Sequence, residues 1–214
     1  MPAITGKQYI DRIDQLNSEI WVDGKKVTGK ISEHPAFKGV MKSQAALFDM
    51  QHDPNLKDIL TYPSPTTGDS VGLSFLEPKT KEDLVKKRMM VQEWARATNG
   101  LMGRSPDYMN TTLMAYASSA KLLEGKNSCF PQYLQSYFEY VRENDLTLTH
   151  SFIEPQVNRT FYYLEDEKEP IAAKVIGENE EGIIIKGARL LATQGGMTDE
   201  ILVYSMGPII DEGK

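Results

Sequence analysis

The chain has 214 residues, a formal net charge of −6 and a pI of about 5.2. Such an acidic composition does not predict the broad basic surface with which proteins bind nucleic-acid phosphates. Its one cysteine, Cys129, excludes an internal disulfide and any cysteine-built metal site within these residues, which favours a reducing cytoplasm. Neither a signal peptide nor an apolar run of membrane-spanning length is present, so we expect no membrane among its partners. From the acidic charge we expect no nucleic acid either.

Apolar residues recur at helical spacing over most of the first 145 positions. Thr5 and Gln8 fit a capping box at the start of a first helix, and Asp23-Gly24 predicts a tight hairpin turn. Further helices are expected over 35–50, 80–99 and 106–123 and from Pro131, with an irregular, proline-rich loop over 62–69. The helix that begins after Thr80 is expected to bury one face, made of Leu84, Arg88, Val91, Trp94 and Ala95.

After Asp145 the apolar period changes from 3.6 to 2. Leu148, His150 and Phe152 alternate with polar residues, which predicts a strand with His150 on its apolar side. Further strands are expected over 160–164, 171–177, 182–191 and 201–205. The sequence therefore predicts an α+β protein with a helical domain over 1–145, a partial antiparallel β-barrel or sandwich over 146–214, and a ligand cleft between the two domains.

The stretch from Gly103 to Asn110 places a cation and a phenol four positions apart. If a helix begins near Pro106, Arg104 lies in the loop before it and Tyr108 in its first turn, beside the positive end of the helix dipole. Such a pair suits an anionic or hydrogen-bonding oxygen. His150 is the best candidate for proton transfer, because imidazole can donate or accept a proton near neutral pH. Taken singly, each of the three is more often structural.

Two later stretches suit a flat, polar ligand. In Pro155–Arg159, Gln156 and Asn158 offer donors and acceptors and Arg159 offers a rigid fork, so a flavin or nucleotide could use them. In Thr193-Gln194-Gly195-Gly196, paired glycines allow close approach of the backbone. The sequence contains no dinucleotide-binding glycine motif, no Walker-type lysine loop, no His-Glu-x-x-His and no Gly-x-Ser-x-Gly, so no nicotinamide, nucleoside-triphosphate or metal site is expected.

Four motifs, taken in their order and spacing, resemble the large, oxygenase component of the two-component 4-hydroxyphenylacetate 3-monooxygenases. They are Gly103-Arg104-Ser105-Pro106-Asp107-Tyr108, Leu148-Thr149-His150, Pro155-Gln156-Val157-Asn158-Arg159 and Ala192-Thr193-Gln194. The resemblance implies an acyl-CoA dehydrogenase-like fold, of which this chain would hold the helical N-terminal domain and part of the β-domain, without the C-terminal helical domain. It also implies ortho-hydroxylation of 4-hydroxyphenylacetate or a similar para-substituted phenol to a catechol. O2 and reduced FAD from a separate flavin reductase would be used, in a homo-oligomer, a tetramer when full length.

The same resemblance implies roles for individual residues. Arg104, Tyr108 and His150 match the catalytic positions that hydrogen-bond the phenolic oxygen of the substrate, and Ser205 lies near the position that holds its acidic tail. The positions that match the FAD-contacting segments are Gln156, Val157, Asn158, Arg159 and Thr193. No metal ligand is implied.

Two alternatives stay open. The 4-hydroxybutyryl-CoA dehydratases of the same superfamily hold an iron–sulfur cluster besides flavin, and have cysteines in the region where this sequence has Arg104 and Tyr108. The other alternative is an inactive, truncated module that binds flavin weakly or packs against a partner. We expect the 214-residue stretch to be inactive alone.

Overall fold

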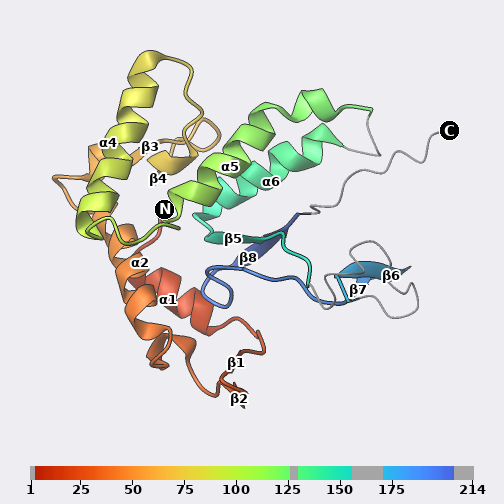
Figure 1. The fold of residues 1–214 in the computed structure, drawn as a ribbon. Helices are drawn as coiled ribbons and strands as arrows, with labels where there is room; N and C mark the ends of the chain where they lie inside the picture. Colours follow the sequence, from red (N-terminus) through yellow and green to blue (C-terminus); the bar gives the residue numbers. More distant parts are fainter. Residues whose placement is uncertain (1–2, 126–129, 156–170, 205–214) are drawn as a thin grey trace. The chain divides into compact units, whose positions relative to one another are not determined.

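The computed structural model describes residues 3–125, 130–155 and 171–204 (Figure 1). The chain divides into two compact units, Met1–Leu148 with Gly196–Glu200, and Thr149–Gly195 with Ile201–Lys214. Helices dominate the described part of the first unit, and short antiparallel strands dominate that of the second. This is the predicted α+β arrangement, with helices first and strands after them.

The elements, in chain order, are mostly short. The helices are α1 (Gly6–Asp14), η1 (Ile31–Glu33), α2 (Lys38–Met50), α3 (Lys57–Leu60), η2 (Leu73–Phe75), α4 (Lys81–Ala97), α5 (Asp107–Ser118), η3 (Ala120–Leu123) and α6 (Pro131–Asn144). The strands pair as β1 (Trp21–Val22) with β2 (Lys25–Lys26), β3 (Thr61–Pro63) with β4 (Ser70–Gly72), β5 (Leu148–Ser151) with β8 (Glu200–Val203), and β6 (Lys174–Asn179) with β7 (Gly182–Lys186).

Local signals in the sequence place several element ends correctly. The Thr5 hydroxyl accepts a hydrogen bond from the Gln8 amide at the start of α1, and Thr80 and Asp83 form the same box at the start of α4. Asp23 and Gly24 both have positive φ, 49° and 72°, in the turn between β1 and β2. Such a turn matches the twist of the two strands, which is why the dipeptide predicts it.

The start of one predicted helix is wrong, and one predicted loop is shorter than expected. The helix expected from Pro35 begins at Lys38, because His34 to Phe37 form a turn in which the His34 carbonyl accepts from the amides of both Phe37 and Lys38. The loop expected over 62–69 is present over 64–69, because residues 62 and 63 belong to β3, which pairs with β4. A turn closed by the Ser64 amide on the Asp69 carbonyl, at 2.7 Å, brings the two strands together.

The buried face of α4 also differs from the prediction. Trp94 is buried as expected, with Met90 beside it, in a hydrophobic cluster that includes Leu60. Leu84, however, is 58% exposed, and Val91 is exposed as well. The helix packs on α3 and η2 along a face centred on Met90 and Trp94, which lies about a quarter turn from the predicted face.

The core of the first unit joins α1, α2 and the returning segment 196–200. Tyr9 and Phe48 stack with ring centroids 5.3 Å apart, and Gly6 lets the two helices approach, because an added Cβ would lie 2.4 Å from the Ala45 carbonyl oxygen. The Tyr9 hydroxyl donates to the Met197 carbonyl at 2.8 Å. The helical unit is therefore completed by residues almost two hundred positions away.

A buried carboxylate ties the same unit together. The side chain of Asp199 is 7% exposed and forms an ion pair with Arg12, with Nε and Oδ1 2.5 Å apart. Its Oδ2 accepts from the Thr147 amide at 2.7 Å and from the Thr147 hydroxyl at 2.8 Å. Arg12 also donates to the Asp145 carbonyl at 2.9 Å. Asp199 thus links the N-terminal helix to the end of the helical segment.

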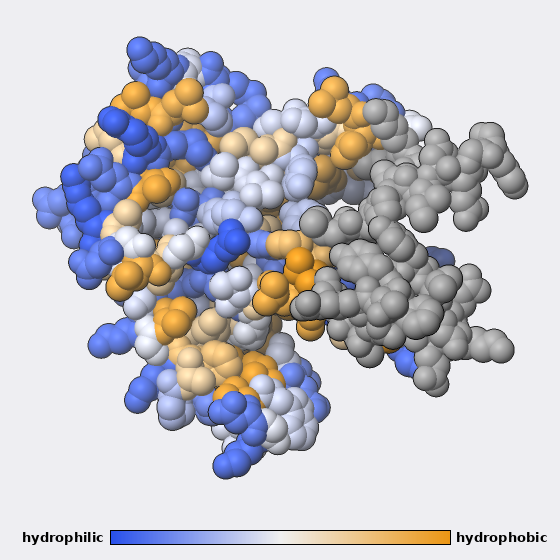
Figure 2. All heavy atoms as spheres, viewed as in Figure 1, coloured by the Kyte–Doolittle hydropathy of each residue, from blue (hydrophilic) through white to orange (hydrophobic). Residues whose placement is uncertain are grey.

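Apolar side chains also lie on the surface. Leu122 in η3 is 73% exposed, and the β6–β7 hairpin exposes Val175, Ile183 and Ile185. Figure 2 shows hydrophobic residues on the visible face over the end of α5 and η3. Within the described residues, these faces remain in contact with solvent.

Replacing Asp145 by asparagine is expected to change how stability depends on pH. The Asp145 carboxylate is buried and accepts from the Ile4 amide at 3.2 Å and from Gln51 Nε2 at 2.9 Å, and burial raises its pKa to about 6. Because the folded pKa lies above the unfolded one, the folded state binds the proton more tightly. The Asp145 contribution is therefore full below about pH 4 and is lost as pH rises through about 6, a change of about 3 kcal/mol.

Asparagine has no proton to lose, keeps an acceptor oxygen and tolerates the left-handed backbone at this position, where φ is 45°. We therefore expect the variant to gain stability relative to the unmodified protein as pH rises from 4.5 to 7, measured by urea unfolding at each pH. Asp69→Asn, at an exposed turn, is the control. Parallel curves for Asp145→Asn and the unmodified protein would contradict this assignment.

Candidate active site

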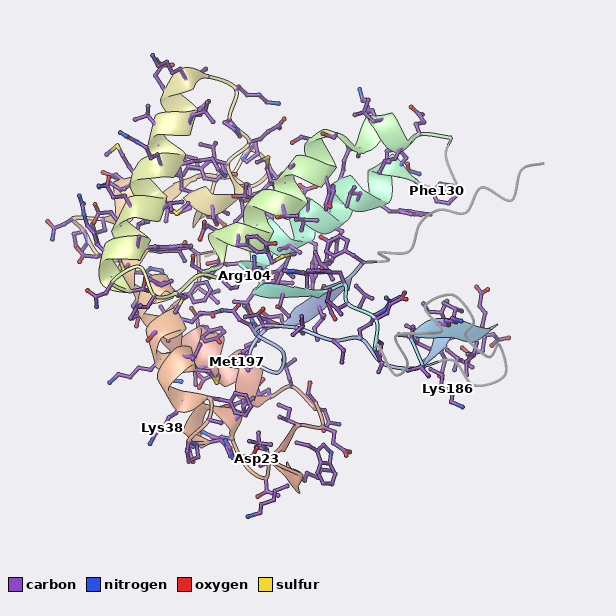
Figure 3. All side chains as sticks on the ribbon, viewed as in Figure 1. Asp23, Lys38, Arg104, Phe130, Lys186 and Met197 are labelled. Carbon is purple, nitrogen blue, oxygen red and sulfur yellow. The ribbon has the colours of Figure 1, made fainter. Side chains whose placement is uncertain are left out.

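The start of α5 carries two of the predicted site residues. α5 begins at Asp107 with Pro106 as its N-cap, so Arg104 lies in the loop before the helix and Tyr108 in its first turn, as the sequence predicts. The backbone is folded tightly here, because the Tyr108 amide donates to the Ser105 carbonyl at 3.1 Å. Figure 3 labels Arg104 at this end of the helix.

Arg104 and Tyr108 contact each other directly. The Arg104 guanidinium carbon lies 4.2 Å from the centroid of the Tyr108 ring, a cation–π contact. Tyr108 is 39% exposed, and Arg104 is half-buried. The contact holds a fixed positive charge beside a phenol hydroxyl on an accessible surface, which is an arrangement able to bind an anionic or phenolic oxygen.

The loop is supported from within by Asp107. Its Oδ1 accepts from the Ser105 hydroxyl at 2.5 Å, and burial raises the pKa of this carboxyl above its usual value. Asp107 also stands in the first turn of α5, where a negative charge is favoured by the helix dipole. The hydrogen bond between Ser105 and Asp107 therefore fixes the short segment that joins Arg104 to Tyr108.

His150 lies on β5 in an aromatic environment. The side chain is 5% exposed, and its ring stacks on Phe152 at 5.0 Å between centroids and 4° between planes. Tyr204 approaches the imidazole edge-on at 6.2 Å. His150 and Phe152 share one side of the strand, as the alternation predicts.

The opposite side of β5 is not solvated, although alternating polar residues suggest that it would be. Thr149 and Ser151 are both buried. The Ser151 hydroxyl donates to the Leu190 carbonyl at 2.7 Å, and the Thr149 hydroxyl accepts from the Gln194 amide at 3.4 Å. Hydrogen bonds to the chain from 190 to 194 thus replace water at these positions.

Thr193 lies in a turn next to this strand. The Gly195 amide donates to the Ala192 carbonyl at 2.9 Å, and Thr193 itself is exposed. Leu191 has φ of 63°, which is strained for a leucine, and such strain is concentrated at functional sites. Through the bond between Thr149 and Gln194, the turn is attached to the residue that precedes His150.

The structure therefore brings the predicted residues together in two groups. Arg104 and Tyr108 form one group in the first unit, and His150 and the Thr193 turn form another in the second. The remaining predicted positions lie outside the described residues: Gln156, Val157, Asn158, Arg159 and Ser205. Cys129 lies outside them as well.

Tyr204 was not predicted as a site residue. It follows β8, and its amide donates to the Ser151 carbonyl at 2.9 Å, which places its ring against His150. Sequence spacing carries no signal for this contact, because the pairing of β5 with β8 joins residues more than fifty positions apart. The strand expected over 201–205 could only have suggested that Tyr204 belongs to a sheet.

Among residues 3–125, 130–155 and 171–204, no cluster of three or more histidine, cysteine, aspartate or glutamate side chains is arranged to hold a metal ion. In the same part of the chain, every helix is too short or too polar to cross a membrane.

Three comparisons with known proteins bear on this site. The family described as "4-hydroxyphenylacetate 3-hydroxylase N terminal" matches residues 5–214. A probable 4-hydroxyphenylacetate 3-monooxygenase of Bacillus subtilis (strain 168) is 53% identical over 205 residues, which are 96% of this chain and 42% of that protein. The oxygenase component of a 4-hydroxyphenylacetate 3-monooxygenase, solved in complex with FAD and 4-hydroxyphenylacetate, is 39% identical, with a TM-score of 0.83 over 94% of this chain and 41% of that one.

A 4-hydroxybutyryl-CoA dehydratase from N. maritimus has a TM-score of 0.76 over 94% of this chain and 39% of that one, but it is only 16% identical, so the likeness is one of fold alone. The acyl-CoA dehydrogenase-like fold predicted from the sequence is confirmed by these likenesses. The chain spans about two fifths of the length of the relatives it matches.

Proposed function

The chain belongs to the 4-hydroxyphenylacetate 3-hydroxylase family, and from this premise we propose that it is part of the oxygenase component of a two-component, flavin-dependent phenol hydroxylase. The reaction is ortho-hydroxylation of 4-hydroxyphenylacetate or a similar para-substituted phenol to a catechol. The observation that carries the proposal is the chain-long likeness to a structure that binds both FAD and 4-hydroxyphenylacetate.

In this proposal Arg104, Tyr108 and His150 hold the phenolic oxygen. A fixed guanidinium favours the ionised phenol, and ionisation raises electron density on the ring carbon ortho to the oxygen, which is the carbon that reacts. Tyr108 donates a hydrogen bond that orients the oxygen, and His150 accepts or returns its proton. The contact between Arg104 and Tyr108 supports this role, because it fixes the cation before the substrate arrives.

Ser205 is proposed to bind the acidic tail of the substrate, and the FAD-binding residues are proposed to be Gln156, Val157, Asn158, Arg159 and Thr193. Among the described residues, the Thr193 turn fits a flat cofactor, since it exposes a hydroxyl and lacks a side chain at Gly195. FAD, when bound in its reduced form, supplies two electrons that let one oxygen atom of O2 enter the ring while the other leaves as water.

Further parts of the proposal concern assembly and context. A separate flavin reductase would supply reduced FAD, and the oxygenase would work as a homo-oligomer, a tetramer when full length. The helical domain over 1–145 and the β-domain over 146–214 are proposed as the two domains of this stretch. The single cysteine is consistent with a cytoplasmic enzyme.

The dehydratase alternative is not favoured, because its iron–sulfur cluster needs several cysteine ligands and this stretch has Cys129 alone. The inactive-module alternative concerns the 214-residue stretch by itself. Titration of reduced FAD against that stretch addresses it, since tight binding would show that the cofactor site needs no further chain.

The decisive assay combines the full chain with a reductase that reduces FAD. 4-Hydroxyphenylacetate is added as the substrate. We expect 3,4-dihydroxyphenylacetate to form, detected by chromatography and mass spectrometry, and phenylacetate, which lacks the hydroxyl, to remain unchanged. His150→Ala should lower the rate by a factor of about 10². The proposal fails if no para-substituted phenol yields a catechol while reduced FAD and O2 are present.

A further inference from the structure

A lysine of α4 binds the short helix η2, which in turn contacts the N-terminal part of α5. Lys87 Nζ donates to the Ser74 carbonyl at 2.8 Å and to the Leu76 carbonyl at 3.1 Å, so it binds the C-terminal end of η2. These carbonyls are left without helical partners there, and a cation is favoured at such an end. The other lysines of α4, such as Lys86, are exposed.

The same short helix holds the N-terminal part of α5. The Ser74 hydroxyl accepts from Asn110 Nδ2 at 2.9 Å, and both side chains are buried. Asn110 lies two residues after Tyr108, and the Asn110 amide donates to the Pro106 carbonyl at 3.1 Å. Ser74 therefore receives one hydrogen bond from α4 through its carbonyl and one from α5 through its hydroxyl.

The charge of Lys87 also acts on Asp107. Burial lowers the pKa of Lys87 to about 8, and the nearby Asp107 carboxylate opposes this change. Conversely, burial raises the pKa of Asp107, and Lys87 is one of the groups that oppose it. Each charge thus makes the partly buried charge of the other less costly. Asp107 in turn accepts from Ser105, which adjoins Arg104.

We propose that Lys87 is a positioning residue for the phenol site, holding the loop of Arg104 and Tyr108 in place through η2 and Asp107. The inference rests on the proposed function for its effect on catalysis, but its structural part stands on contacts within the first unit. Lys87 does not touch the substrate in this scheme. Its loss would loosen the first turn of α5 and misplace the two residues that bind the phenolic oxygen.

The test uses Lys87→Met in the full chain, with Lys86→Met as the matched control one residue away on the exposed face. For Lys87→Met we expect KM for 4-hydroxyphenylacetate to rise about tenfold while kcat changes less than about threefold, as for a misplaced binding group. Hydrogen–deuterium exchange should accelerate about tenfold in peptides covering 103–110. Lys86→Met should match the unmodified protein in both measurements.

Asp107→Asn removes the charge that interacts with Lys87 and keeps an acceptor oxygen for the Ser105 hydroxyl. This variant replaces Lys87→Met in the test if Lys87→Met does not fold. The proposal is overturned if folded Lys87→Met or Asp107→Asn matches Lys86→Met in KM and in exchange. If the unmodified protein forms no catechol and binds no phenol, the proposed function fails instead. The exchange over 103–110 then still decides whether Lys87 holds the loop.

Discussion

Replacing Arg104 by methionine is expected to lower kcat/KM for phenol hydroxylation by a factor of about 10² to 10³, as loss of one preorganised group facing a developing charge does. Methionine preserves much of the length and the apolar contact with the Tyr108 ring, and removes the positive charge that lies 4.2 Å from it. The bound phenol then keeps its proton more tightly, and the ring carbon becomes less reactive. The measurement is steady-state catechol formation with the reductase in excess.

Arg96→Met is the control, because Arg96 lies in the last turn of α4 and forms an exposed pair with Glu93. It should leave kcat/KM within about twofold, since exposed pairs contribute little. Arg104→Lys should restore only part of the activity, because an ammonium lacks the planar fork of a guanidinium. An Arg104→Met enzyme that retains more than about a third of kcat/KM would remove Arg104 from the site.

Replacing Asp199 by alanine is expected to lower the free energy of unfolding by up to about 3 to 5 kcal/mol, the range for breaking a buried ion pair from one side, because Asp199 is 7% exposed although Arg12 is 27% exposed. The substitution leaves the Arg12 guanidinium without its carboxylate, and the Thr147 amide and hydroxyl without their acceptor. Each buried donor left without a partner adds its own desolvation cost. Urea unfolding at pH 7, followed by circular dichroism, measures the effect.

Asp11→Ala provides the comparison, because the Asp11 carboxylate pairs with Lys7 on the exposed side of α1. We expect a change below about 1 kcal/mol for this variant. A loss of similar size for Asp199→Ala and Asp11→Ala would mean that the buried pair contributes no more than a surface pair. In that case the return of residues 196–200 to the helical unit would have to depend on apolar contacts such as Met197.

Signals that span a few residues predicted their structures well. Thr5 with Gln8, Thr80 with Asp83, and Asp23 with Gly24 each act through neighbouring backbone groups, so the sequence around them is sufficient. The start of α5 near Pro106 belongs to the same class, which is why Arg104 and Tyr108 were placed correctly relative to the helix. Their roles in binding a phenol remain a prediction.

Features set by distant residues were not predictable in the same way. The exposed position of Leu84 depends on how α3 and η2 meet α4, and the burial of Thr149 and Ser151 depends on a segment some forty residues later. Periodicity alone reports which residues share a face, but not which face another element covers. The Lys87 contacts with η2 are of this kind, since a lysine among other charged residues on a helix reads as solvated.

The path of the chain through the two units has a consequence for how the protein folds during synthesis. The chain leaves the first unit after Leu148, returns to it for Gly196–Glu200, and leaves it again. The Tyr9 hydroxyl and the Arg12 guanidinium therefore lack their partners until Met197 and Asp199 are synthesised, roughly 10 to 40 seconds later at about 5 to 20 residues per second. Until then the side of α1 that Met197 and Asp199 contact is not covered by them. Covering it closes a loop of nearly fifty residues, and this loop closure costs conformational entropy.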